Sequence, residues 1–128
     1  MPELIKYTLE FPINSSINIL YLRLSSPSGL AEWFADNIIV KNNIYTFIWG
    51  ESKQKARLLT KKHNRFIRFK WEDNETQGDY FEFFIQVDEM TSDVSLLVTD
   101  FAENQEDQEE QTDLWNKQIS SLKRAIGS

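Results

Sequence analysis

The sequence has no cysteine and a single histidine among its 128 residues. The absence of cysteine excludes disulfides, thiolate nucleophiles and metal sites with cysteine ligands. One histidine also leaves little room for metal sites or acid–base catalysis that use imidazole. Uninterrupted apolar runs are short, the longest being ILYL at residues 19–22, so we expect neither a membrane-spanning helix nor a signal peptide. We therefore expect a cytoplasmic protein with no metal and no cofactor.

Glycine-rich loops and a surplus of basic residues are also missing. The four glycines, Gly29, Gly50, Gly78 and Gly127, are isolated from one another, so no loop could cradle a phosphate. No serine lies in the context of a nucleophile elbow. Lys and Arg number 14 against 20 Asp and Glu, which gives a net charge of −6. This balance argues against nucleic acid and anionic membranes as partners.

Six of the acidic residues fall within residues 103–113, a segment with no Lys or Arg. One interpretation is an acidic tail that binds a partner. We favour a second one, in which the segment is the solvated approach to a helix over residues 114–126, whose own charges are Lys117, Lys123 and Arg124. Acidic residues near the beginning of a helix and basic residues near its end are stabilised by the helix dipole.

Aromatic residues are plentiful, at 13% of the chain. A length of 128 residues suits one domain, residues 1–128, with a core of its own. Residues 4–11 alternate between apolar and polar side chains. This alternation predicts a strand with one buried face, which Pro12 ends.

Two short helices are predicted after this strand. Asn14 and Ser15 are candidate N-caps for the first helix, which reaches about Leu24. Ser26 caps the second, and Pro27 lies in its first turn, where the missing N–H is harmless. The apolar side of this second helix carries Leu30, Trp33 and Phe34.

From residue 38 onward the pattern becomes that of short strands joined by short turns. The predicted strands cover residues 38–40, 44–49, 56–62, 65–71, 81–87 and 94–101, with a polar loop at 73–78. Such a series is typical of an antiparallel meander. Trp115, Ile119, Leu122 and Ile126 then form one stripe of a long amphipathic helix. We therefore predict an α+β protein in which this helix covers the apolar face of a curved antiparallel sheet.

Three local motifs add a family resemblance. The segment LAEWF at residues 30–34 is similar to an L-x-x-W-F motif, FIRFKW at residues 66–71 to an L-x-F-x-W strand, and Trp115 to the aromatic residue that opens a final helix. With the order of elements, these motifs resemble the START-like (SRPBCC, Bet v-like) superfamily and its helix-grip fold. The closest likeness is to homologues of the activator of the 90-kDa heat-shock chaperone ATPase. The resemblance implies a hydrophobic ligand between the sheet and the last helix.

The candidate binding site is aromatic. Strand alternation and the helix stripes direct a set of rings into one interior, and Arg57 is the polar group that we expect at its mouth. The proposed ligand-binding residues are Trp33, Phe47, Trp49, Arg57, Phe69, Trp71, Phe83 and Trp115. The alternative is that these rings form a solid core without a cavity.

The remaining polar residues give no catalytic set. His63 lies in a basic hairpin turn, where we expect it to be solvated. Most carboxylates, Asp100 among them, fall at strand ends or turns, where hydration is easy. Glu82 lies within a strand, on the outer sheet face, and should pair with Arg68 or Lys70 across the strands. A buried acid with a raised pKa is the alternative for Glu82.

Three apolar side chains are expected on the outer face of the sheet. Phe66, Phe84 and Ile48 lie opposite the inward sets, among polar neighbours. They indicate either a partner surface, such as that of a homodimer, or scattered surface side chains.

Three functions follow in order of preference. The first is non-enzymatic binding of a small hydrophobic molecule. The second is an interaction module, either a homodimer or a chaperone-linked adaptor. The third is an enzyme of the polyketide cyclase type, which would need a polar dyad inside the cavity.

Overall fold

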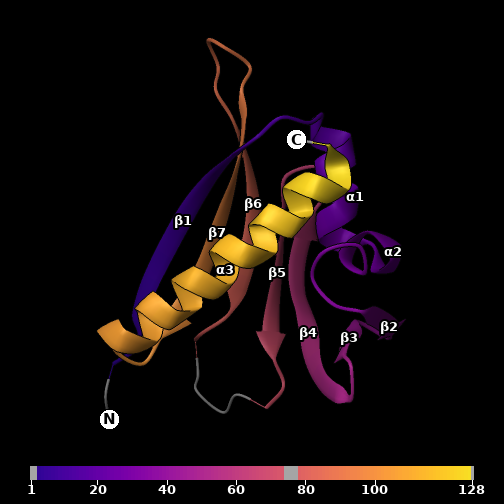
Figure 1. Cartoon of the computed structure of the whole chain (residues 1–128), viewed down its shortest axis with the longest axis vertical. Helices are drawn as coiled ribbons and strands as arrows, with labels where there is room; N and C mark the ends of the chain where they lie inside the picture. The colour runs from indigo at the N-terminus through magenta and orange to yellow at the C-terminus, as the bar shows by residue number, and fades with distance from the viewer. Residues whose placement is uncertain (1–2, 74–77, 128) are drawn as a thin grey trace.

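A seven-stranded antiparallel sheet and three helices make up the part of the chain that the computed structural model describes, residues 3–73 and 78–127 (Figure 1). The elements are β1 (Ile5–Ile13), α1 (Ile17–Ser25), α2 (Pro27–Leu30), β2 (Asn37–Lys41), β3 (Ile44–Trp49), β4 (Ser52–Lys62), β5 (Phe66–Trp71), β6 (Phe81–Val87), β7 (Val94–Ala102) and α3 (Gln105–Ile126). The strands lie in the order β1-β7-β6-β5-β4-β3-β2, so β2 to β7 form the predicted meander. The α+β helix-grip architecture is therefore confirmed.

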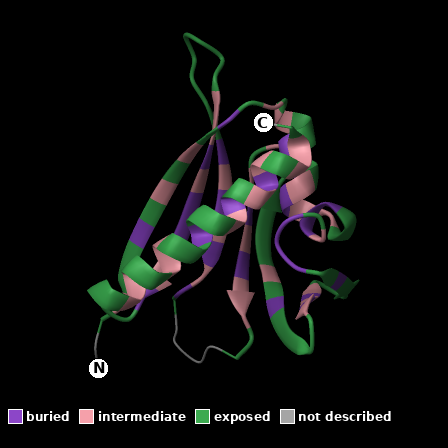
Figure 2. Ribbon diagram, in the orientation of Figure 1, coloured by how far each residue is buried: buried purple, intermediate pink, exposed green. Residues whose placement is uncertain are grey.

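The core lies between the sheet and α3, which crosses one face of the sheet diagonally (Figures 1 and 2). Alternate side chains of the central strands are buried on this face, as in β5, where Ile67 and Phe69 are fully buried and Arg68 between them is not. Trp115, Ile119 and Leu122 are the buried residues of α3. The inward side chains of the strands, which recur every second residue, and the apolar stripe of the helix, which recurs every three or four residues, therefore pack together in one apolar layer.

The strand β1 continues past the proline that was expected to end it. Pro12 lies opposite Ser95 in the register of β1 with β7, and Ile13 pairs with Val94. Because β1 is an edge strand, a residue without an N–H can be accommodated there with no loss of a ladder hydrogen bond. The predicted end at Pro12 was wrong for this reason.

The two short helices differ from the prediction at their ends. Ser16, and not Asn14 or Ser15, caps α1, and its side chain accepts a hydrogen bond from the N–H of Ile19 at 3.2 Å. Ser26 caps α2 as predicted, accepting from the N–H of Gly29 at 3.0 Å. The helix α2 ends at Leu30, so Trp33 and Phe34 lie in the turns that follow and not on the helix.

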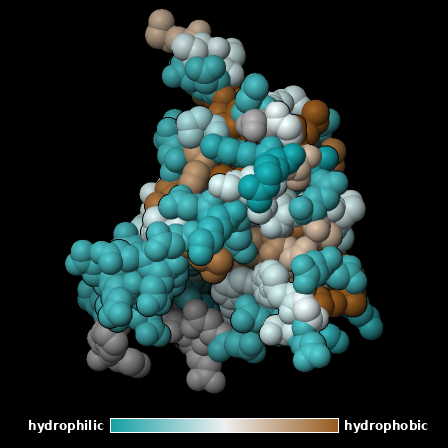
Figure 3. Space-filling model, viewed as in Figure 1, coloured by the Kyte–Doolittle hydropathy of each residue, from teal (hydrophilic) through white to brown (hydrophobic). Residues whose placement is uncertain are grey.

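The acidic segment belongs to α3 itself. The helix begins at Gln105, where the Asn104 side chain accepts from the N–H of Asp107 at 2.8 Å, well before the predicted start at residue 114. Acidic residues occupy its first turn and basic residues its last, as the dipole favours. The surface over its N-terminal half is hydrophilic (Figure 3).

Four residues of the predicted polar loop, 74–77, lie outside the described residues. Among the described helices, none is both long enough and apolar enough to cross a membrane.

Candidate functional site

The predicted aromatic residues meet between the sheet and α3. Trp33 contacts Phe83 with ring centroids 5.6 Å apart, and Phe83 contacts Trp115 at 5.7 Å. Phe47 links to Trp71 at 5.6 Å and to Phe69 at 6.1 Å. Trp49 and Trp71 face each other at 6.4 Å. One connected network of rings therefore contains all seven predicted aromatic side chains, joined through Phe81.

Phe34 is a centre of this network that was not among the predicted site residues. Its ring contacts six others, those of Trp33, Phe47, Trp49, Phe81, Phe83 and Trp115. The turn after α2 inserts this ring between the sheet and α3. Its position after Trp33 in the LAEWF motif was the available signal.

The deep part of the interior is filled and its open end is not. Phe47, Phe69 and Phe83 are completely buried in the core and are not among the described residues that line a cleft. Beside this core lies a cleft of about 250 Å³. Its lining residues are Phe34, Trp49, Gln54, Trp71, Asp100, Gln111, Leu114, Trp115 and Gln118. A neighbouring hollow of about 380 Å³, which Trp33 lines, shares Phe34, Trp49, Leu114 and Gln118 with it. Solid core and cleft thus coexist.

Asp100 is the carboxylate of the cleft, and the sequence-based interpretation placed it among the easily hydrated ones. It lies in β7 on the inward face, opposite Tyr7 of β1. Its Oδ2 accepts a hydrogen bond from Nε1 of Trp115 at 3.0 Å, and its Oδ1 accepts from the N–H of Phe101 at 2.8 Å. The alternation of Leu96, Val98 and Asp100 along the strand was the signal that could have found it.

Burial raises the pKa of Asp100 from 3.8 to about 6. The hydrogen bonds from Phe101 and Trp115 lower the pKa, and the negative charges of Asp107 and Asp79 raise it. Desolvation is the largest of these effects. A carboxyl group that titrates near neutrality in a cleft is a common property of binding and catalytic sites.

Tyr7 connects β1 to α3 beside Asp100. Its hydroxyl donates to Oε1 of Gln111 at 2.5 Å, and Nε2 of Gln111 donates to Oδ2 of Asp107 at 3.2 Å. Burial, and then the charge of Asp100, raise the pKa of the Tyr7 hydroxyl, so it stays protonated as a donor. This chain of hydrogen bonds fixes the helix over the strand edge of the cleft.

The structure places Arg57 outside the cleft, at a separate hollow of about 360 Å³ that it lines together with Trp71 and Glu72. Its neighbour Ala56 is fully buried on the inner face, and Arg57 is paired in register with Lys70 on the outer face. Its side chain is 65% exposed, with Glu72 at 3.8 Å. Arg57 therefore does not line the cleft.

The outer face carries a paired set of aromatic and charged side chains. The guanidinium of Arg68 donates to Oε2 of Glu82 from Nε at 2.8 Å and from Nη2 at 2.7 Å. Of the two predicted partners of Glu82, Arg68 is therefore the one that pairs with it. Phe66 and Phe84 stack with centroids 6.3 Å apart. Ile48 lies far along the sheet on β3, opposite Asn37, and not with these rings.

His63 lies at the β4–β5 turn and is exposed, with its ring 5.4 Å from that of Tyr21.

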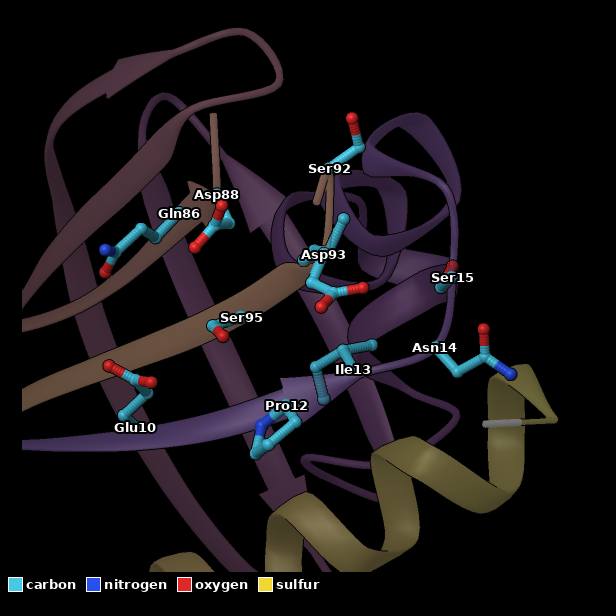
Figure 4. A pocket seen from close by; sticks show the side chains of 11 residues that line it. Glu10, Pro12, Ile13, Asn14, Ser15, Gln86, Asp88, Ser92, Asp93 and Ser95 are labelled. Carbon is cyan, nitrogen blue, oxygen red and sulfur yellow. The ribbon is translucent and has the colours of Figure 1, made fainter. Parts of the chain in front are cut away.

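A larger hollow, about 700 Å³, is a polar groove between the β1–α1 connection and the β6–β7 hairpin (Figure 4). Carboxylates of Glu10, Asp88 and Asp93 line it, and its described lining residues include no aromatic ring. Oδ1 of Asp88 accepts from the backbone N–H groups of Met90 and Thr91, which lowers the pKa of that carboxyl. Within residues 3–73 and 78–127, no group of three or more His, Asp or Glu side chains could hold a metal ion.

Comparison with known proteins gives the family. A model of the START-like superfamily domain matches residues 1–128. No curated protein matches the chain. A Bacteroides fragilis protein whose structure was determined by NMR is 36% identical, with 94% of this chain and 90% of that chain covered and a TM-score of 0.69.

Two more distant structures share the fold. The Aha1 dimer from Colwellia psychrerythraea is 16% identical over 95% of this chain and 96% of that one, with a TM-score of 0.80. DynU16, from the dynemicin biosynthetic locus, is 10% identical over 96% of this chain and 47% of that one, with a TM-score of 0.79. At these identities the likeness extends to the fold alone.

Proposed function

The chain belongs to the START-like superfamily, and from that premise we propose that it binds a small hydrophobic molecule in the cleft between the sheet and α3, without catalysing a reaction. The observation that carries this proposal is the cleft itself, whose walls include the indole rings of Trp49, Trp71 and Trp115. Apolar, aromatic walls with a few convergent polar groups are typical of small-molecule sites.

The volume of the cleft limits the size of the ligand. An apolar cavity of about 150 Å³ accommodates benzene, so about 250 Å³ suits a molecule with one or two rings or a short acyl chain. A ligand with about nine non-hydrogen atoms, at about 0.5 kcal/mol per atom, would gain between 4 and 5 kcal/mol, which corresponds to a dissociation constant of about 0.5 mM. Larger molecules would need the neighbouring hollow as well.

The polar lining supports binding over catalysis. Of the described residues that line the cleft, Asp100 is the single titratable one, and the others with polar side chains are Gln54, Gln111 and Gln118. A cyclase-like reaction requires a general acid and a general base placed around one substrate. Asp100 alone could act as the general acid or as the general base, but not as both groups around one substrate.

A fluorescence titration tests the proposal, because three of the four tryptophans line the cleft. We expect 2-phenylethanol, a small neutral aromatic alcohol, to shift the tryptophan emission in a saturable way, and native mass spectrometry to show one molecule per chain. Trp71→Leu should weaken binding by about fivefold, since it removes most of one aromatic wall.

Phe84→Leu is the matched control, because it shortens an aromatic side chain on the opposite face of the sheet. It should leave binding unchanged. An emission that does not saturate, or a loss of binding in Phe84→Leu equal to that in Trp71→Leu, would contradict the proposal.

A second candidate function is self-association through the outer face. The stack of Phe66 and Phe84 is only partly buried, and Leu97 lies beside Phe84 in the register of β6 with β7. All three helices of the described chain pack on the other face (Figure 1). The Colwellia protein, which shares the fold, was solved as a dimer.

Sedimentation velocity over a range of concentrations tests this second candidate. A dimer that Phe84→Lys dissociates, and that Ile39→Lys leaves intact, would support it. Ile39 is a suitable control because it is 56% exposed and lies on β2 at the far edge of the sheet. A monomer at all concentrations would rule out this function.

A further inference from the structure

The charge of the cleft wall is of one sign. Three indole rings line the cleft together with the carboxyl group of Asp100, and no Lys or Arg is among its described lining residues. The face of an indole ring carries a negative electrostatic potential, which attracts cations. Rings and carboxylate therefore act in the same direction on a ligand.

The charged groups around Asp100 strengthen this effect. From α3, Asp107 faces it, and from the segment before β6, Asp79 adds a second negative charge, although Asp79 is itself paired with Lys70 at 2.5 Å. From β1 the facing group is the neutral hydroxyl of Tyr7. Within residues 3–73 and 78–127, no Lys or Arg forms a salt bridge with Asp100. In this part of the protein the half-buried carboxylate of Asp100 therefore has no salt-bridge partner of its own.

The affinity of this cleft for a ligand should depend on the charge of the ligand. An anion would meet the carboxylate and the ring faces with repulsion. A neutral molecule would remove water from the carboxylate without replacing its hydration, which is costly. A cation would replace the lost water with an ion pair and cation–π contacts.

We infer that the ligand is an organic ammonium ion, with its apolar body against the tryptophan rings and its charged nitrogen beside Asp100. This inference rests on the proposed function, because it names the ligand class of the same cleft. The hydrogen bond from Trp115 to Oδ2 orients the carboxylate, and the N–H of Phe101 holds Oδ1. Each oxygen has a further lone pair with which to accept a hydrogen bond from an ammonium group.

A pair of ligands of nearly equal shape separates charge from hydrophobicity. The 2-phenylethylammonium ion and 2-phenylethanol differ mainly in the replacement of an ammonium by a hydroxyl group. At about pH 8 we expect the cation to bind about tenfold more tightly than the alcohol, by the same tryptophan titration. The preference should shrink as the pH falls to about 5, because a protonated Asp100 carries no charge.

Two carboxylate variants locate the effect. Asp100→Asn should remove most of the preference for the cation. Asp88→Asn, which neutralises a carboxylate in the groove of Figure 4, should retain it. The ratio of the two dissociation constants is the quantity to compare, since it cancels changes in the amount of folded protein.

Each other outcome overturns a definite part of the reasoning. If the alcohol binds as tightly as the cation, the inference is wrong and the proposed function stands. If neither binds, both are wrong. If the preference survives in Asp100→Asn, Asp100 is not the counter-ion. Should that variant fail to fold, the pH series of the unaltered protein decides, and a preference that stays constant between about pH 8 and pH 5 overturns the inference.

Discussion

Replacing Asp100 by asparagine should stabilise the protein at neutral and alkaline pH, although it changes a half-buried and hydrogen-bonded side chain. The pKa of Asp100 is about 6 in the folded protein against an ordinary 3.8. Between these values the folded state binds more protons than the unfolded state. The free energy of unfolding therefore decreases as the pH rises through this window, and the full cost is present above about pH 6.

The size of the effect follows from the shift. A difference of about two pKa units corresponds to about 3 kcal/mol. Asparagine has a single acceptor oxygen, so it can serve either the Trp115 N–H or the Phe101 N–H, and the lost hydrogen bond costs about 1 kcal/mol. We therefore expect Asp100→Asn to be more stable than the unaltered protein by about 2 kcal/mol at pH 8 and about equally stable at pH 4.5.

Urea denaturation followed by circular dichroism at three or more pH values provides the measurement. The comparison of variant with unaltered protein at each pH removes the contributions of groups that both share. If Asp100→Asn is less stable by the same amount at every pH, the carboxyl group is not desolvated and the reasoning fails.

Asp88→Asn is a control with the opposite sign. Backbone N–H groups of Thr91 and Met90 lower the pKa of Asp88, so its contribution to stability is present above its ordinary pKa and is lost as the pH falls. This variant should be less stable than the unaltered protein at neutral pH, and the difference should shrink in acid. As the pH rises, the stability of Asp100→Asn relative to the unaltered protein should therefore increase, whereas that of Asp88→Asn should decrease.

Three further predictions concern the fold. Gly29→Ala should destabilise the protein by about 3 kcal/mol in urea, because a Cβ would lie 2.1 Å from the carbonyl oxygen of Leu22; an unchanged midpoint would contradict this. Truncation after Thr112 removes the buried stripe of α3, worth roughly 6–10 kcal/mol, so no cooperative melting should remain. Tyr7→Phe should cost about 1 kcal/mol by removing the hydrogen bond to Gln111, and a silent variant would show that bond to be unimportant.

Most of the fold could be predicted from the sequence because its periodicities are strong. The six meander strands and the stripe of α3 lie where apolar spacing placed them, except that β4 begins at Ser52, four residues before its predicted start. The errors fall at the ends of strands and helices, because the position of an element in the folded protein decides where it ends. Pro12 is tolerated because β1 is an edge, and α3 extends back to Asn104, which supplies the N-cap. Neither fact is a property of the local sequence.

The site was harder to predict than the fold. Alternation brought the seven rings together correctly, but it could not decide how much space they leave, because that depends on where α3 crosses the sheet. Arg57 was misplaced although the same alternation, counted from Ala56, directs it outward. Asp100 was overlooked because a position near the end of a strand was equated with hydration, whereas the N-terminal half of α3 covers that end.

Asp100 joins the stability of the fold to its proposed function. A half-buried carboxylate without a salt-bridge partner is a net cost in the unliganded protein, and the sequence could avoid that cost with an amide of the same shape. A bound ammonium ion would reverse the balance, since it would lower the pKa of Asp100 and stabilise the folded state through binding. The ligand should therefore raise the melting temperature of the unaltered protein more than that of Asp100→Asn, and more at pH 8 than at pH 5. Asp100→Asn, which should be more stable than the unaltered protein without ligand, should gain less stability when the ligand binds. An equal rise in melting temperature in both proteins would show that Asp100 affects stability but does not bind the ammonium group.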